Sequence, residues 1–291
     1  MLDLNEYTIT AEVHRRFAGA PDLRLREILT ALVQHLHDFA REVKLTEPEW
    51  MTGIEFLTRT GQLCSNTRQE FVLLSDTFGL SQLVVAQSHS REEGVSEQTV
   101  FGPFHVEEAP KVAGLNSDIA KGATGDPLYV SAHVLSAGAP VAKAVVDVWH
   151  ADADGQYDVQ DANWTIEKSR MRAVFETDAD GRIGFWSVLP KSYPIPTDGT
   201  VGEMIRATKQ SSMRPAHVHF RIRREGFDTL VTHVFANGDT YLDADAVFGV
   251  RSSCIGNYES RPPGIAPDGR VMARHFFTLD FCFVLEPALT C

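Results

Sequence analysis

The sequence predicts a mixed, mainly β protein: an antiparallel β-sandwich preceded by an α-helical N-terminal domain. Over the first hundred residues, apolar side chains recur at intervals of three and four, which is the period of amphipathic helices. Beyond Gly102 and Pro103, the apolar residues come in short runs rich in β-branched and aromatic side chains, separated by Gly, Pro, Asp and Asn. No helical stretches alternate with these runs, which disfavours a parallel βαβ sheet. We expect two domains, residues 1–100 and 101–291.

Four helices are expected in the N-terminal domain. The first spans residues 22–43, where apolar residues recur on one face. Thr46 begins the second, because Glu49 three residues later completes a capping box, a sequence signature of a helix start. A third helix is expected around residues 66–77, and a short fourth one after Ser81. All four would present an apolar face for packing.

Six strands are expected in the second domain, each bounded by turn-forming residues. They are LYVSAHVL (128–135), AVVDVWH (144–150), GRIGFWSVL (181–189), AHVHFRI (216–222), TLVTHVFA (229–236) and HFFTLDFCFVL (275–285).

Composition limits the classes of function. The chain has 291 residues, 43% of them hydrophobic, which is enough for a substantial core. Its net charge of −12 disfavours nucleic acid and anionic membranes as partners. The polar N-terminus lacks the apolar segment of a signal peptide, and no apolar run approaches the ~20 residues of a membrane span. The four cysteines are widely scattered, a pattern typical of free thiols in a reducing compartment. We expect a cytoplasmic protein.

The strand at 216–222 carries two histidines, His217 and His219, separated by one residue. Because side chains alternate along a strand, both imidazoles point to the same face. They could be two ligands of one metal, or ordinary polar residues on a half-exposed strand. Two tyrosines stand just past strand ends, Tyr157 in ADGQYD and Tyr193 in LPKSYPIP. Loops at strand ends often carry functional groups, but the residues alone leave both interpretations open.

The order, spacing and flanks of these residues resemble the intradiol ring-cleaving dioxygenases. WHADADGQYD, LPKSYPIP and RPAHVHF follow one another, with Tyr193 36 residues after Tyr157 and His217 24 residues after Tyr193. The resemblance covers nearly the whole chain, including the helical segment EFVLLSDTFGLSQLV, and makes the second domain the catalytic one. It implies that Tyr157, Tyr193, His217 and His219 hold a non-haem Fe(III). Phenolate oxygen is a hard anionic ligand that suits this hard cation, whereas cysteine favours softer metals.

Flanking segments look most like those of hydroxyquinol 1,2-dioxygenases: TVFGPFHVEEAP (99–110), VTHVFANGDTYLDADAVFGVRSS (231–253) and SSMRPAHVHF. This resemblance implies an aromatic diol or triol as substrate, with O2 as co-substrate. Hydroxyquinol (benzene-1,2,4-triol) would be cleaved between its ortho hydroxyls to 3-hydroxy-cis,cis-muconate, or maleylacetate. Catechol and chlorocatechol are the alternative substrates. His233 stands where catechol enzymes tend to have a glutamine.

The resemblance also assigns roles in the substrate pocket. Tyr193 is the ligand that leaves the metal when substrate binds, and Arg214 stabilises negative charge that develops on the ring. Asp76 shares a helix face with Leu73 and could accept a hydrogen bond from the third hydroxyl of hydroxyquinol. The residues expected to line the pocket are Leu73, Asp76, Val100, Phe101, Gly102, Pro103, Phe104, Ile195, Pro196, Arg214, His233 and Val247.

Two other classes of protein and one partner are also considered. A zinc hydrolase could use His217 and His219, but a motif such as HExxH is missing and tyrosine is a poor zinc ligand. A β-sandwich could instead bind a ligand without catalysis. Members of the resembling family pair through their N-terminal helices, so we expect a homodimer, with a lipid that could lie between the helices.

Overall fold

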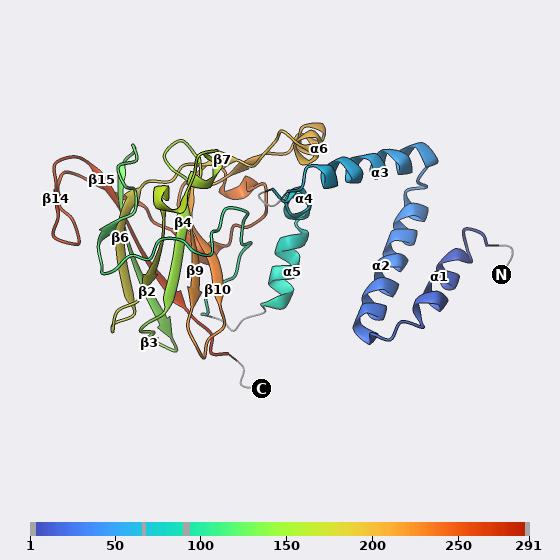
Figure 1. Ribbon diagram of the computed structural model, residues 1–291, viewed down its shortest axis with the longest axis horizontal. Helices are drawn as coiled ribbons and strands as arrows, with labels where there is room; N and C mark the ends of the chain where they lie inside the picture. The colour runs from blue at the N-terminus through green and yellow to red at the C-terminus, as the bar shows by residue number, and fades with distance from the viewer. Residues whose placement is uncertain (1–3, 66–67, 90–93, 289–291) are drawn as a thin grey trace. The chain divides into compact units, whose positions relative to one another are not determined.

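The computed structural model describes residues 4–65, 68–89 and 94–288 (Figure 1). The chain divides into two compact units, one ending at Arg59 and the other starting at Thr60. No helix in the described ranges combines the length and the apolar character that a membrane crossing requires.

The first unit is helical. It contains α1 (Ile9–Phe17), α2 (Leu23–Glu42) and most of α3 (Glu47–Gln62). Asp22 caps α2 by accepting a hydrogen bond from the Leu25 amide at 3.0 Å. The predicted capping box is present: the Thr46 amide donates to Glu49 Oε2 at 2.9 Å, and the Glu49 amide lies 3.5 Å from Thr46 Oγ1. The helix α1 was not predicted.

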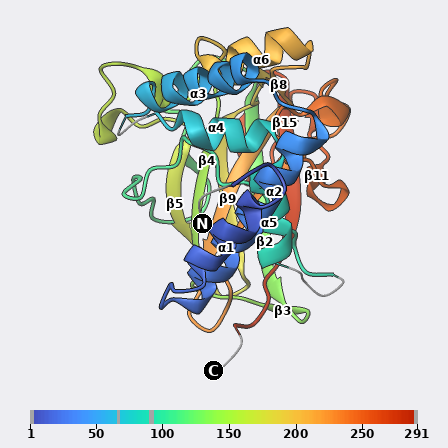
Figure 2. The same ribbon diagram turned by 90° about the vertical axis from the view of Figure 1, so that its right-hand side faces the viewer.

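The second unit adds three helices to the sheets. They are α4 (Glu70–Thr77), α5 (Leu80–Ser88) and α6 (Thr200–Thr208), and Figure 2 shows α4 and α6 together at one end of the sandwich. The predicted third helix began at residue 66, but residues 66 and 67 lie outside the described part. The helix α6 was not predicted. The buried carboxylate of Glu70 accepts from the Val201 amide at 3.2 Å and so caps α6 from a distant part of the chain.

Two sheets form the sandwich. The five-stranded sheet has the order β11 (Ile255–Gly256), β10 (Leu230–Ala236), β9 (His217–Arg223), β4 (Val145–His150), β5 (Arg172–Glu176). The six-stranded sheet has the order β1 (Ser117–Asp118), β6 (Arg182–Val188), β2 (Pro127–Ser136), β15 (Phe276–Val284), β12 (Glu259–Arg261), with β3 (Ala139–Pro140) paired to β2. All six predicted strands are present, and β1, β3, β5, β11 and β12 are additions.

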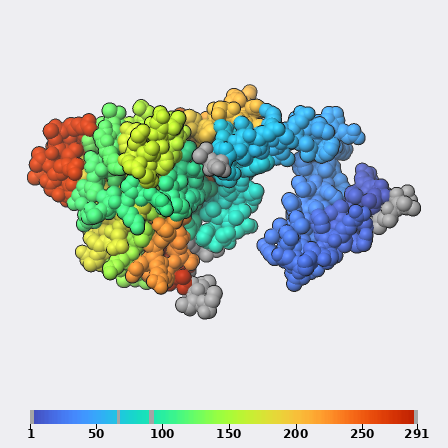
Figure 3. Space-filling view, in the orientation of Figure 1, coloured from blue at the N-terminus to red at the C-terminus, as the bar shows by residue number. Residues whose placement is uncertain are grey.

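Short elements complete the second unit. The hairpin of β13 (Gly264–Ile265) and β14 (Val271–Met272) projects from the sandwich (Figure 3, red). A second hairpin pairs β7 (Tyr193–Pro194) with β8 (Met213–Arg214). The 3-10 helices are η1 (Asp158–Gln160), η2 (Ile166–Lys168), η3 (Leu242–Ala244) and η4 (Ser252–Cys254).

Pairing of the long strands is mostly antiparallel, as predicted, but β15 runs parallel to β2. The core between the sheets is apolar, and Phe220 of β9 meets Phe283 of β15 there, with ring centroids 4.7 Å apart. Alternation along β9 turns Val218 and Phe220 into this core. His217 and His219 therefore share the opposite face, as the sequence predicted.

Candidate metal centre

Four donor atoms converge on the outer face of the five-stranded sheet. Tyr157 follows β4 and immediately precedes η1, Tyr193 begins β7, and the two histidines come from β9. Tyr157 Oη lies 2.9 Å from His219 Nε2, 3.1 Å from Tyr193 Oη and 3.4 Å from His217 Nε2. The two Nε2 atoms are 3.1 Å apart. All four side chains are buried.

This spacing fits the coordination sphere of one metal ion. Ligand atoms held about 2.0–2.2 Å from a metal lie roughly 3 Å from one another at ordinary coordination angles. His217 Nδ1 is 2.7 Å from the carbonyl oxygen of Pro215, and a carbonyl can only accept. The ring proton therefore sits on Nδ1, and in neutral His217 the Nε2 lone pair faces the other donors. Fixing a ligand tautomer through the second ring nitrogen is typical of metal-binding histidines.

Burial sets the protonation of the donors. It raises the pKa of Tyr157 well above 10, because a desolvated phenolate is disfavoured. Burial likewise lowers the pKa of His217 and His219 well below 6.5, so both imidazoles are neutral and carry lone pairs. A cation among these atoms would reverse the balance for tyrosine and favour the phenolate. Two phenolates with two imidazoles form a donor set that suits a hard, highly charged ion such as Fe(III).

A buried arginine stands beside the donors. Pairing of β7 with β8 places Arg214 opposite Tyr193. Its Nε donates to Asp245 Oδ1 at 3.1 Å, and its Nη1 lies 3.3 Å from His217 Nε2. Nη2 is buried and has no partner among the described residues. The site therefore holds a positive charge with a free N–H group, which suits an anionic oxygen.

Aromatic packing fixes the rings of two donors. Phe104 stacks on Tyr157, with centroids 4.4 Å apart and an interplanar angle of 24°. Trp149 stacks on His219 at 4.6 Å and 14°. Gly102 has a φ of +76°, and a Cβ there would lie 3.1 Å from His219 Cε1, so the backbone needs glycine at this close approach. The 99–104 segment thus packs directly on the candidate metal ligands His219 and Tyr157.

The structure brings several predicted pocket residues to this place. Arg214, Gly102, Phe104 and His233 contact the donor side chains. Phe101 packs on Trp149 at 5.7 Å, and Asp76 is buried near the charge of Arg214. For the other predicted residues, the structure shows only that they lie close in sequence to residues of the site. Leu73 shares α4 with Asp76, and Val100 and Pro103 belong to the 99–104 segment. Ile195 and Pro196 come just after Tyr193, and Val247 lies two residues after Asp245.

Sequence reasoning missed three supporting residues. Asp245 pairs with Arg214, Trp149 stacks on His219, and Arg172 pairs with Asp158, the neighbour of Tyr157. Each of the three contacts its partner from a distant part of the chain or from a neighbouring strand. The DADAVFG run (243–249) gave no signal of its partner, because no spacing rule links a loop carboxylate to an arginine 31 residues away.

Comparison with known proteins agrees with this geometry. The family model described as "Dioxygenase" matches residues 100–287, and the one described as "Catechol dioxygenase N terminus" matches residues 22–96. The chain belongs to the intradiol dioxygenases. Because it belongs to this family, the protein is an oxidoreductase. The two alternatives considered from the sequence, a zinc hydrolase and a non-catalytic binding protein, are therefore rejected. Intradiol dioxygenases generally depend on Fe(III), and His217, His219 and His233 form a cluster that could hold a metal ion.

Individual relatives extend over the whole chain. A 6-chlorohydroxyquinol 1,2-dioxygenase of Cupriavidus pinatubonensis is 50% identical, over 99% of this chain and 100% of its own length. A hydroxyquinol 1,2-dioxygenase of Rhodococcus opacus is 45% identical, over 97% and 94%. Among solved structures, hydroxyquinol 1,2-dioxygenase from Pseudomonas putida DLL-E4 superposes with a TM-score of 0.90 at 42% identity, covering 97% of this chain and 99% of that one.

Proposed function

We propose that this intradiol dioxygenase uses Fe(III) to cleave hydroxyquinol between its ortho hydroxyl groups with O2, giving 3-hydroxy-cis,cis-muconate, a tautomer of maleylacetate. The observation that carries the proposal is that Tyr193 Oη and the Nε2 atoms of His217 and His219 all lie within 3.4 Å of Tyr157 Oη, with the two nitrogens 3.1 Å apart. The choice of hydroxyquinol rests on a relative named for hydroxyquinol at 45% identity and one named for 6-chlorohydroxyquinol at 50%, both over nearly the whole chain.

The chain's own residues divide the work. Tyr157, Tyr193, His217 and His219 would hold the metal. Bound Fe(III) supplies a Lewis acid that takes up the deprotonated diol and makes its ring reactive toward O2. Tyr193 Oη would be the donor that gives way to substrate, and it would accept a proton from one of the substrate's hydroxyls. Its position in the two-residue strand β7, which pairs with the equally short β8, supports this.

Two further groups would handle charge. Arg214 Nη2 is buried and unpaired among the described residues, so it can donate to oxygen that becomes negative during the reaction. Asp76 is buried on α4, and burial raises the pKa of its carboxyl while the charge of Arg214 acts in the opposite direction. We assign Asp76 to the third hydroxyl of hydroxyquinol, which a carboxylate can bind as acceptor. Phe101, Phe104, Ile195 and Val247 would form apolar walls.

Oxygen uptake tests the proposal directly. The iron-loaded protein is given hydroxyquinol, catechol and chlorocatechol in turn, and products are identified by mass. We expect the highest kcat/KM with hydroxyquinol and a ring-opened product that has gained both oxygen atoms. A preference for catechol or chlorocatechol would overturn the assignment of hydroxyquinol as substrate, whereas the assignment of the reaction as intradiol cleavage would stand. Absence of oxygen uptake with every diol would overturn the reaction itself.

The partner proposed for the chain is a second copy of itself. One face of α2 leaves large apolar side chains about half exposed, between 47% and 54% for Leu25, Ile28, Leu32, Leu36 and Phe39. A contiguous apolar face of this kind supports a protein interface, and it could also take up a lipid chain. Sedimentation of wild type and of Leu32→Lys tests pairing, because a charge on this face should shift a dimer toward monomer. The four widely scattered cysteines support a cytoplasmic location.

A further inference from the structure

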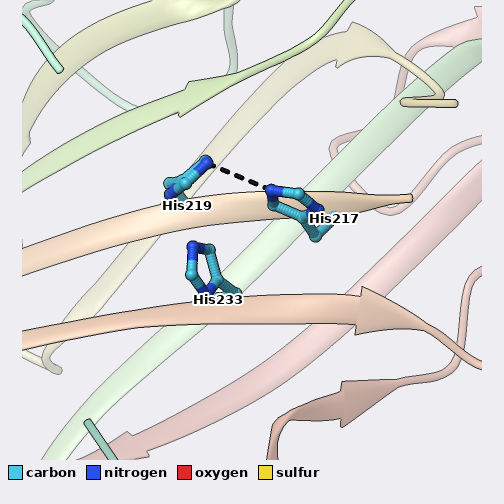
Figure 4. Close-up of side chains that lie close together, drawn as sticks. All are labelled: His217, His219 and His233. Carbon is cyan, nitrogen blue, oxygen red and sulfur yellow. Dashed lines mark hydrogen bonds between the residues drawn. The ribbon is translucent and has the colours of Figure 1, made fainter. Parts of the chain in front are cut away.

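A third histidine, His233, lies beside the two histidines of β9. It comes from the neighbouring strand β10, where antiparallel pairing sets it directly opposite His219. Its ring is fully buried, and its centroid is 4.2 Å from that of His219 at an interplanar angle of 67°. Figure 4 shows the three rings together, with one nitrogen of His233 turned toward the side of His219 that faces away from His217.

Each of these neighbouring rings has one unpaired nitrogen. His219 Nε2 faces the other metal donors, whereas His219 Nδ1 is buried without a hydrogen-bond partner among the described residues. In His233, Nδ1 forms a short hydrogen bond with Thr99 Oγ1, and Nε2 is the buried nitrogen without a described partner. An unpaired buried polar atom costs about 1–3 kcal/mol, so two on adjacent rings need an explanation.

The tautomers of the two rings explain why His219 Nδ1 and His233 Nε2 are both left unpaired. A histidine that gives its Nε2 lone pair to a metal must carry its proton on Nδ1, so His219 Nδ1–H is a donor in need of an acceptor. His233 Nε2 is an acceptor if the His233 proton is on Nδ1. That proton can be donated to Thr99 Oγ1, since a hydroxyl accepts as well as donates. With these tautomers His219 Nδ1–H is matched to His233 Nε2 as donor to acceptor, and His233 Nδ1–H to Thr99 Oγ1; the structure shows the second of these hydrogen bonds and leaves the first pair of atoms unpaired among the described residues.

We propose that His233 is the positioning residue for His219. His233 Nε2 accepts a hydrogen bond from His219 Nδ1–H, and Thr99 in turn fixes the orientation of His233. The inference rests on the proposed metal function. His217 already has an equivalent anchor in the Pro215 carbonyl, 2.7 Å from its Nδ1. His233 approaches the Nδ1 side of His219 and stands behind this ligand (Figure 4). This role differs from the substrate contact that the resemblance assigned to His233.

The arrangement also connects the substrate segment to the metal centre. The Thr99 amide donates to the Val231 carbonyl at 3.0 Å, which fixes Thr99 to β10. Three residues further on, Gly102 packs against His219 Cε1. The segment that carries Phe101 and Phe104 is thus held to His219 at two points, one of them through His233.

Iron retention tests the proposal in three variants of the full chain. Each protein is loaded with Fe(III), and the rate of iron loss to an excess of chelator is compared with wild type. His233→Leu should lose iron about 10- to 100-fold faster, the usual effect of removing a partner of a metal-binding histidine. His233→Gln should stay within a few-fold of wild type, because its amide oxygen can accept. Thr99→Val should lose iron faster than wild type, since His233 loses the acceptor for its Nδ1 proton.

Two controls make the outcome decisive. Circular dichroism and thermal unfolding of the iron-free variants show whether the fold persists, and if His233→Leu does not fold, Thr99→Val and His233→Gln still decide. Wild-type iron retention in His233→Leu or in Thr99→Val would overturn the proposal. Iron loss from His233→Gln as fast as from His233→Leu would also overturn it, by making His233 a ligand. If wild type itself binds no iron, the proposed function fails first.

Discussion

Replacing Arg172 by methionine should destabilise the protein by about 3 kcal/mol, because the change leaves a buried carboxylate without its cation. Arg172 and Asp158 are both buried, with Nη2 2.6 Å and Nε 2.9 Å from Asp158 Oδ1. The third nitrogen, Nη1, donates to the Phe104 carbonyl at 2.8 Å. Asp158 follows Tyr157 in the chain, and Phe104 stacks on the ring of Tyr157, so the same ion pair supports the candidate metal centre.

The magnitude follows from what remains around Asp158. Removal of one partner from a buried ion pair costs about 3–5 kcal/mol. Asp158 keeps three neutral donors, the amides of Val159 and Arg170 and the indole Nε1 of Trp164, at 2.9, 3.1 and 3.1 Å. These favour the lower end of the range. In a unit of this size, about 3 kcal/mol corresponds to a fall in Tm of roughly 6–12 °C.

Urea unfolding of the iron-free protein measures the effect. Arg172→Met, Asp158→Asn and the double variant form a cycle, and the double variant should be less destabilised than the sum of the single changes. Arg261→Met is the matched control. Its ion pair with Glu259 has side chains 50% and 46% exposed, so its loss should cost less than about 1 kcal/mol. An Arg172→Met variant as stable as this control, or an additive cycle, would refute the reasoning.

Three further changes test separate parts of the account. Asp76→Asn should lower the hydroxyquinol-to-catechol ratio of kcat/KM by about ten- to a hundredfold, and an unchanged ratio in steady-state assays would show that the carboxylate does not read the third hydroxyl. Asp245→Asn loosens Arg214 and should lower kcat at least about tenfold while bound iron stays constant; an unchanged kcat contradicts this. Burial lowers the pKa of His150 to about 4, so the unfolded chain binds the proton first as pH falls below about 6.5. Between pH 7.5 and 5, iron-free wild type should therefore lose about 2 kcal/mol more unfolding free energy than His150→Gln, and equal losses in a pH series of urea titrations would be inconsistent with a depressed pKa.

Local patterns predicted the parts of the fold that depend on local rules. The alternation of β9 placed His217 and His219 on one face, and the Thr46–Glu49 capping box marked the start of α3. The convergence of Tyr157 and Tyr193 on these histidines did not follow from spacing. It came from resemblance to a known family, because loop conformation decides where a residue past a strand end points.

Features that depend on distant partners could not be predicted. The cap of α6 comes from Glu70, 131 residues before Val201. The position of the Arg214 side chain depends on its hydrogen bond to Asp245. The parallel pairing of β15 with β2 joins two segments far apart in the chain, which strand composition does not encode. His233 was visible in the sequence, yet its relation to His219 needed the register of β9 and β10.

Iron content and visible absorption of the purified protein test the central claim most directly, since Fe(III)–phenolate absorbs visible light. The account predicts about one iron per chain, a reddish protein, and loss of iron or of the band in Tyr157→Phe and His219→Ala. It also predicts that the band shifts when hydroxyquinol is added without oxygen, because substrate displaces Tyr193. A protein that binds no iron, or a Tyr157→Phe variant with wild-type iron content, spectrum and turnover, would contradict the assignment of these four side chains as the metal centre.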